Sequence, residues 1–158
     1  MESISVTDLL TTLQAERVVM QNLLDCIRGE QQSLTKDNLQ EVSALLEQKA
    51  ALIAQLANLS ARRHALLVQH GWPNGEVGMQ AWLEAHPDTT VSDTWNTLLD
   101  QVRLAKDLNH TNGLIINTQL NRKHQALHIL TGNTALEKLY GADGQPNRPA
   151  FNRGHVIG

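Results

Sequence analysis

Residues 36–70 read KDNLQEVSALLEQKAALIAQLANLSARRHALLVQH, and this stretch decides the fold. Its aliphatic residues recur at alternating spacings of three and four, the pattern of a helix that packs against other helices. Thr35 is expected to cap the start of the helix, with Leu34 and Leu39 as a hydrophobic staple. Gly71 and Pro73 are expected to end it. The apolar stripe consists of Leu39, Val42, Leu46, Ile53, Leu56 and Leu67, and it is interrupted by Lys49 and Arg63.

The same pattern predicts two further long helices on either side of this one. The first covers residues 6–28, with Ser5 and Asp8 as a capping box and Gly29 as its end. The third begins near Thr90, runs to about residue 130 and ends at Gly132. Between the second and third, residues 71–91 are rich in glycine and proline, and residues 79–85 can form a short helix. A short connection at residues 30–34 makes the first two long helices antiparallel.

These patterns predict an all-α fold, an antiparallel bundle of three long helices with a short extra helix and a flexible C-terminal tail. The bundle domain is assigned to residues 1–132, and residues 133–158 are expected to form one short helical turn and the flexible tail. Composition agrees, because 41% of the residues are apolar but only 3% are aromatic. We find no internal repeat and no strand-like alternation.

The expected helix lengths leave part of the bundle uncovered. At 1.5 Å per residue the three helices span roughly 35, 50 and 60 Å, so the first is too short to cover the other two. The uncovered stripe could be covered by the short helix, by a second copy of the chain, or by an amphipathic helix of a partner. We therefore expect a binding surface on the longer helices.

Composition and the chain start indicate a cytoplasmic, soluble protein. The N-terminus lacks the pattern of a secretory signal, and the longest apolar run, residues 50–54, is far too short to span a membrane. Cys26 is the single cysteine, which excludes an internal disulfide, and we expect it to be a core residue rather than a nucleophile. The net charge of −3 does not favour nucleic-acid binding.

No pattern of catalytic chemistry is present. His124 and His128 are four residues apart and could share one helix face, but no third metal ligand follows at a characteristic spacing. The sequence has no nucleophile elbow, phosphate-binding loop or dinucleotide-binding glycine pattern. We expect a protein that is not an enzyme and needs no cofactor or metal.

Several polar residues lie within the apolar stripes, where they could determine how the helices align or which partner binds. Glu16, Lys49, Asn109 and Asn112 occupy positions where a bundle favours apolar side chains. They could lie at wet ends of the bundle or fix its register, and the sequence does not say whether Glu16 faces Lys49. Three tryptophans near the connection between the second and third helices, at positions 72, 82 and 95, are expected to pack as a small core.

Four blocks of the chain together resemble one protein family. They are LLTTLQAERVVMQNLLDCI (residues 9–27), LEQKAALIAQLANLSARR (46–63), LAKDLNHTNGLIINTQLNRKHQALHIL (104–130) and LYGADGQ (139–145). In this order, with the N-x-x-N-G motif and the Tyr-Gly-x-Asp-Gly motif, they resemble the flagellar export chaperones of the FlgN family. The resemblance covers about residues 5–145.

The resemblance implies a cytoplasmic chaperone of the flagellar type III export system without enzymatic activity. Such proteins bind the hook–filament junction proteins FlgK and FlgL, prevent their premature assembly and deliver them to the export apparatus. By position, the implied client-binding residues are Gly113, Ile116, Leu120, Leu127 and Leu130. Tyr140 corresponds to the tyrosine that is thought to contact the export gate protein FlhA.

Two other interpretations remain open at the level of sequence. The same stripes could make a homo-oligomeric coiled-coil protein with a structural or regulatory role. Alternatively, the His124 and His128 face could bind a metal in an enzyme or metal protein.

Overall fold

The computed structural model describes residues 4–87, 89–120 and 136–141. Its helices are α1 (Val6–Thr35), α2 (Leu39–Gln69), α3 (Glu76–Ala85) and α4 (Thr89–Leu120). The part of the chain that the structure describes contains no strand, so the predicted all-α fold is confirmed. Within these residues, no helix has both the length and the apolar character needed to cross a membrane.

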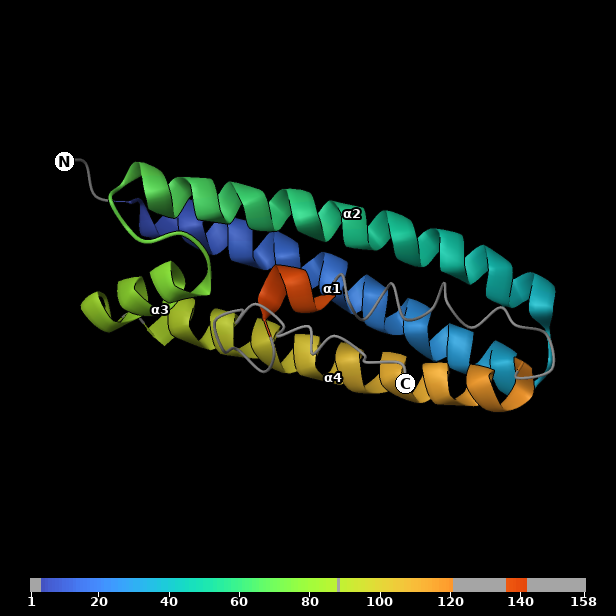
Figure 1. The fold of residues 1–158 in the computed structure, drawn as a ribbon. Helices are drawn as coiled ribbons and strands as arrows, with labels where there is room; N and C mark the ends of the chain where they lie inside the picture. The colour runs from blue at the N-terminus through green and yellow to red at the C-terminus, as the bar shows by residue number, and fades with distance from the viewer. Residues whose placement is uncertain (1–3, 88, 121–135, 142–158) are drawn as a thin grey trace, which may run out of the picture.

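Helix α1 lies between α2 and α4 in an elongated bundle (Figure 1). It packs against α2 in antiparallel orientation and against α4 along most of its length, whereas the backbones of α2 and α4 do not run against each other in the described residues. Helix α3 connects α2 to α4 at the end of the bundle where the chain begins (Figure 1). One face of α1 is therefore left to be covered by something other than the long helices.

Helix α1 continues past the position at which the sequence indicated its end. Gly29 lies inside the helix, and a Cβ atom there would be 3.5 Å from a methyl group of Leu45 on α2. Beyond it, Glu30, Ser33 and Leu34 are buried, so packing of the last two turns outweighs the roughly 1 kcal/mol that a helical glycine costs. The predicted end at Arg28 was wrong for this reason.

The connection between α1 and α2 also differs from the prediction. Asp37 has a left-handed φ of 56°, and Asn38 caps α2 through a hydrogen bond from the Glu41 backbone N–H at 3.2 Å. Thr35 is thus the last residue of α1 rather than the cap of α2. Because α1 has 30 residues and α2 has 31, the inference that the first helix is too short to cover the second was also wrong. The described part of α4 has 32 residues, and the predicted continuation of this helix to about residue 130 lies outside the described residues.

The corner formed by α3 holds the tryptophans as predicted. Trp82 and Trp95 are buried and Trp72 is half-buried against the same core. The indole ring of Trp82 stacks on the imidazole of His86 at a centroid distance of 4.5 Å. Gly78 permits the tight approach of α3 to the preceding loop, because a Cβ atom there would lie 1.8 Å from the carbonyl oxygen of Pro73.

Candidate functional site

Two buried ion pairs cross between α1 and α2. The first joins Glu16 to Arg63, with the guanidinium Nε donating to a carboxylate oxygen at 2.7 Å. Arg63 Nη2 also points to the second carboxylate oxygen and to Ser60 Oγ, each at 3.4 Å. The guanidinium lies over the ring of Trp95 on α4, 4.7 Å from the centroid. Glu16 therefore faces Arg63 and not Lys49, which the sequence had left open.

Residues 136–141, which we call the C-terminal turn, cover this first ion pair. Their helical part, residues 136–140, buries Leu136 and Tyr140 in the main core. The Tyr140 hydroxyl donates a hydrogen bond to Glu16 at 3.2 Å. Lys106 on α4 donates to the Gly141 carbonyl. The turn thus occupies the uncovered face of α1 between α2 and α4 (Figure 1).

The docking of the C-terminal turn is close to balanced in energy. Burial of one leucine and one tyrosine is worth roughly 6 kcal/mol, and two hydrogen bonds add about 2 kcal/mol. Ordering six residues costs roughly 8 kcal/mol.

Burial near this turn raises the pKa of two titratable groups. Burial raises the pKa of Tyr140 well above 10, and the Glu16 carboxylate acts in the same direction. Glu76, in the first turn of α3, has two buried carboxylate oxygens without a hydrogen-bond partner in the described residues. Burial raises the pKa of Glu76 to about 7, against the opposing influence of Arg63 and Lys106.

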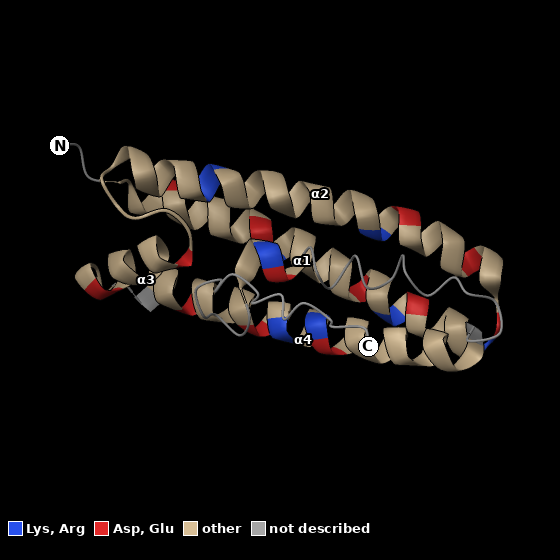
Figure 2. Ribbon diagram, in the orientation of Figure 1, with Lys and Arg blue, Asp and Glu red and all other residues tan. Residues whose placement is uncertain are grey.

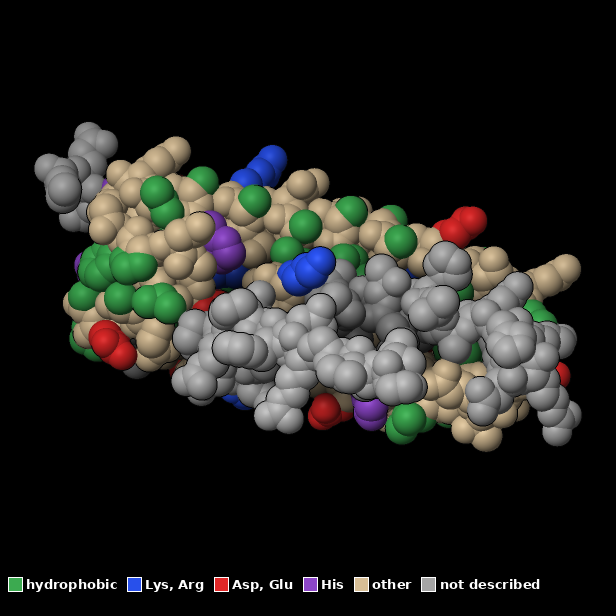
Figure 3. Space-filling view, viewed as in Figure 1, with side chains coloured by type: hydrophobic (Ala, Val, Ile, Leu, Met, Phe, Trp, Pro, Cys, Tyr) green, Lys and Arg blue, Asp and Glu red, His purple; other side chains and the backbone are tan. Residues whose placement is uncertain are grey.

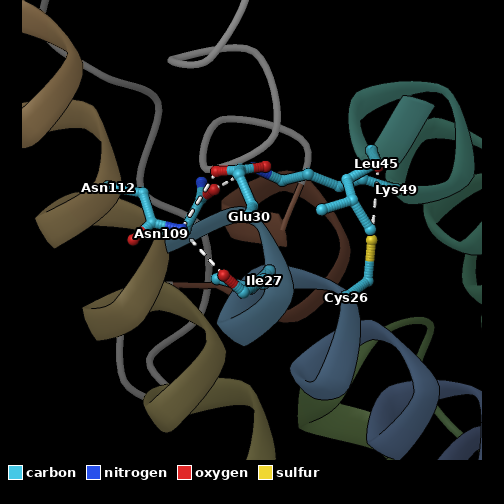
Figure 4. A network of polar contacts seen from close by, with 7 residues as sticks. All are labelled: Cys26, Ile27, Glu30, Leu45, Lys49, Asn109 and Asn112. Carbon is cyan, nitrogen blue, oxygen red and sulfur yellow. Dashed lines mark hydrogen bonds and ion pairs between the residues drawn. The ribbon is translucent and has the colours of Figure 1, made fainter. Parts of the chain in front are cut away.

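The second ion pair belongs to a network that links all three long helices (Figure 4). Lys49 on α2 donates to the Glu30 carboxylate at 3.3 Å and also to the side-chain oxygen of Asn109. From α4, the Asn112 amide donates to Glu30 at 3.0 Å and to the Ile27 carbonyl at 2.9 Å. Since all four polar side chains of this network are buried, they fix the register of the helices rather than lie at wet ends.

Cys26 lies beside this network and is buried, as predicted. Its thiol points at the Leu45 carbonyl at 3.2 Å (Figure 4). Burial raises the pKa of Cys26, the Glu30 carboxylate adds to this, and Lys49 opposes it. Such a thiol is protonated and inert rather than nucleophilic.

The described C-terminal part of α4 contains three of the predicted client-binding residues. Ile116 is fully buried against Leu34 and Val42, where it anchors α4 to the ends of α1 and α2. Gly113 is half-buried, and a Cβ atom there would meet no other atom of the described residues within 4 Å, so this glycine does not serve a close approach of the described helices. Leu114 points outward and is 53% exposed. Leu120 is the last residue of the helix.

The remaining predicted site residues are either buried or outside the described ranges. Tyr140 is 1% exposed and lies in the core. Leu127 and Leu130 lie outside the described residues, as do His124 and His128. Among the residues that the structure describes, no group of three histidine, cysteine or carboxylate side chains could hold a metal ion.

Sequence reasoning missed the partners in these contacts. Arg63 was recognised as an interruption of the stripe, but its pairing with Glu16 spans 47 positions and has no local signal. The sequence indicated burial of the C-terminal turn only weakly, through the spacing of four between Leu136 and Tyr140, which places both on one helix face. Lys106 carried no signal, because its acceptor is a backbone carbonyl.

Residues of both charge signs occur on each of the three long helices. In the view of Figure 2, acidic and basic positions are interspersed over the three long helices, although the two acidic residues of α2 precede its basic ones. Hydrophobic side chains gather over the α3 end in Figure 3, where Val77 is 49% exposed.

The chain is similar in sequence to several flagella synthesis proteins. The chain is similar to the flagella synthesis protein FlgN of Proteus mirabilis, with 29% identity over 143 residues that cover 89% of this chain and 91% of the relative. It is 28% identical to the flagella synthesis proteins FlgN of Salmonella typhimurium and Salmonella typhi, with the same coverage of both chains. No solved structure matches the chain. The profile of the FlgN protein family matches residues 1–148, and the chain therefore belongs to the FlgN family.

Proposed function

We propose that this protein is a cytoplasmic type III export chaperone for the hook-associated proteins FlgK and FlgL. It binds these clients, prevents their premature assembly and delivers them to the export apparatus through the gate protein FlhA. Support comes from membership of a family whose relatives are named flagella synthesis proteins. In this role the protein needs binding energy and no catalysis.

The observation that carries the proposal is the two-sided character of the C-terminal part of α4. Its inner side is anchored by Asn112 and Ile116, while Leu114 stands 53% exposed on the outer side. An exposed leucine on a helix whose other side is packed in the bundle is suited to bury the apolar face of a client helix. The proposal also includes client-binding roles for Gly113, Ile116, Leu120, Leu127 and Leu130. Because Ile116 is buried, its role is to hold α4 in position for the client rather than to contact the client.

The test is a titration of the purified chain with FlgK or FlgL from the same genome. Replacement Leu114→Asp should weaken binding at least tenfold, because it places a charge in the apolar contact. The matched control is Val18→Asp, at a valine on α1 that is 63% exposed. Equal affinities for the two variants would contradict the assignment of the surface to α4.

The alternative of a homo-oligomeric coiled-coil protein rests on the same apolar stripes. In the described residues those stripes are largely used inside one chain, since the main core joins α1, α2, α3 and α4. A molecular mass that rises with concentration in the absence of client would support the alternative.

A further inference from the structure

A second exposed apolar surface lies at the end of the bundle that holds α3. Val68 in the last turn of α2 and Val77 in the first turn of α3 are each 49% exposed. Trp72, in the loop between these helices, and Leu83 on α3 are half-buried against the core. We call Val68, Trp72, Val77 and Leu83 the α3 surface.

Backbone contacts make the α3 surface continuous. The Trp72 backbone N–H donates to the last turn of α2 at 3.0 Å, which holds Trp72 beside Val68. A Cβ atom on Gly78 would lie 1.8 Å from the Pro73 carbonyl oxygen, so Val77 lies against the same loop. Hydrophobic side chains accordingly gather over the α3 end in Figure 3. Contiguous apolar side chains of this kind mark a contact surface for another protein.

The fixed charge around the α3 surface has one sign. Histidines aside, every charged residue in the segment 64–102 is an aspartate or a glutamate. Figure 2 shows acidic and no basic positions on α3 and on the first turns of α4. The segment is bordered by Arg63, which is buried in an ion pair, and by Arg103, which pairs at the surface. Arg62 is the nearest exposed cation in sequence without an ion pair in the described residues.

Charge and shape decide what can cover the α3 surface. A second copy that packed through the same surface would bring the acidic side chains against themselves, and like charges in an interface weaken binding. Lysine or arginine around an apolar face supplies the complementary charge. The described residues offer no strand edge, so the backbone of the partner must satisfy its own hydrogen bonds, as it does in a helix.

The α3 surface is remote from the part of α4 to which we assign the client. Val91 lies near the start of α4, and Ile116 near the end of its described part. The helix rises about 37 Å between these two residues. A helix bound at one end of the bundle therefore leaves the other end accessible.

We propose that the α3 surface binds a basic amphipathic helix of a partner other than the client, and that it does so while the client is bound. The independence from the client rests on the proposed function. Recognition of a basic helix does not, because it follows from the apolar and acidic side chains of the α3 end alone.

The probe is a synthetic helical peptide with leucine on one face, lysine on the other, and no aromatic residue. Trp72, Trp82 and Trp95 are the three tryptophans of the chain, and they pack in the core at the α3 end, so their fluorescence reports binding there. The peptide should change that fluorescence, and its affinity should fall at least tenfold as salt rises from about 0.05 to about 0.5 M. A peptide with glutamate in place of lysine, or serine in place of leucine, should not bind. Binding that ignores either replacement overturns the proposal.

Paired variants locate the contact. Val77→Ser and Glu84→Lys should each weaken peptide binding about fivefold or more, because they remove an apolar contact and reverse a charge. The matched controls are Val18→Ser on α1 and Glu47→Lys on α2, which make the same changes at exposed positions away from α3. Both controls should bind like the parent chain. Equal affinities of the α3 variants and their controls overturn the proposal.

Two further measurements distinguish other occupants of the α3 surface. If Arg148→Glu combined with Arg153→Glu strengthens peptide binding, the C-terminal residues of the chain itself cover the surface, and the proposal is overturned. If the chain alone is a dimer that Val77→Ser dissociates, a second copy covers it, which also overturns the proposal. A parent affinity unchanged by the double variant, with no dimer that depends on Val77, supports a separate partner.

The client complex provides the last comparison. With FlgK or FlgL bound, the chain should bind the peptide with unchanged affinity. Competition would place the α3 surface inside the client site and overturn the assignment to a second partner. Failure to bind either client contradicts the proposed function, whereas peptide binding by the free chain still decides whether the α3 surface recognises a basic helix.

Discussion

Glu16 on α1 and Arg63 on α2 form an ion pair of 2.7 Å in which both side chains are completely buried. Both residues occupy positions in apolar stripes, and each interrupts its own stripe. Paired in this way, the two interruptions fix the antiparallel register of α1 against α2, because a shift along either helix would bury each charge alone.

Removal of one member of this pair should therefore destabilise the fold strongly. We expect Glu16→Leu to lower the free energy of unfolding by about 3–5 kcal/mol, because the Arg63 guanidinium is left buried without a counter-charge. The double variant Glu16→Leu with Arg63→Met should recover most of that loss. Urea denaturation of the parent, single and double variants measures both effects, and an additive loss in the double variant would contradict the account.

Loss of Lys49, the cation of the second ion pair, should lower the free energy of unfolding less than loss of Glu16 does. In Lys49→Met, the Glu30 carboxylate keeps the hydrogen bond from Asn112 at 3.0 Å. We expect a loss of about 2–3 kcal/mol in the same urea experiment, smaller than for Glu16→Leu. A control at Arg103, whose ion pair with Asp100 is exposed, should change stability by less than about 1 kcal/mol on replacement by Met. If Lys49→Met changed the free energy of unfolding as little as the Arg103 variant does, the network would not contribute to the packing of α2 on α1.

Glu76 should make stability depend on pH near neutrality. Its folded-state pKa is raised from 4.5 to about 7, so its contribution is fully present below pH 4.5 and is lost as the pH rises through 7. Glu76→Gln should match the parent chain at pH 4.5 and be more stable at pH 8, by on the order of 1 kcal/mol after allowance for partial exposure. Thermal unfolding of both proteins at the two pH values provides the comparison.

His64 makes the stability depend on pH in the opposite direction to Glu76, but it does not affect the comparison of the parent chain with Glu76→Gln. Burial lowers the pKa of His64 to about 4, so its contribution is present above pH 6.5 and is lost as the pH falls through 4. Since both proteins contain His64, it cancels in their difference. A difference between parent and Glu76→Gln that is the same at pH 4.5 and pH 8 would show that this carboxylate does not titrate as described.

Cys26 should react slowly with thiol reagents in the native protein. Burial and the nearby Glu30 carboxylate raise the pKa of its thiol, so little thiolate is present at pH 7.5 and little of it is accessible. We expect the reaction with a chromogenic disulfide reagent to be at least a hundredfold slower in the folded chain than in 6 M guanidinium. Comparable rates in the two conditions would place the thiol at the surface.

The sequence was sufficient to predict the number and type of the elements, because the long amphipathic stripes are local signals. The all-α bundle, the short helix before the third long one, and the buried positions of Cys26 and Trp82 all followed from periodicity and composition. The end of α1 did not follow, since Gly29 reads as a helix end and the burial of Glu30, Ser33 and Leu34 beyond it favours continuation of the helix.

The candidate site was harder to predict because its contacts are long-range. Glu16, Lys49, Asn109 and Asn112 were recognisable as misplaced polar residues, but which of them pair depends on how the helices are aligned. The contact of Tyr140 with Glu16 spans 124 positions and needs the C-terminal turn to fold back on the bundle. No pattern within a single helix contains that information.

The most direct test of the chaperone proposal is to co-express the chain with FlgK or FlgL from the same genome and measure the mass of the purified material by light scattering. The account predicts a discrete complex with one copy of each protein, in which the terminal region of the client resists protease. A chain that stays alone or only self-associates would contradict it.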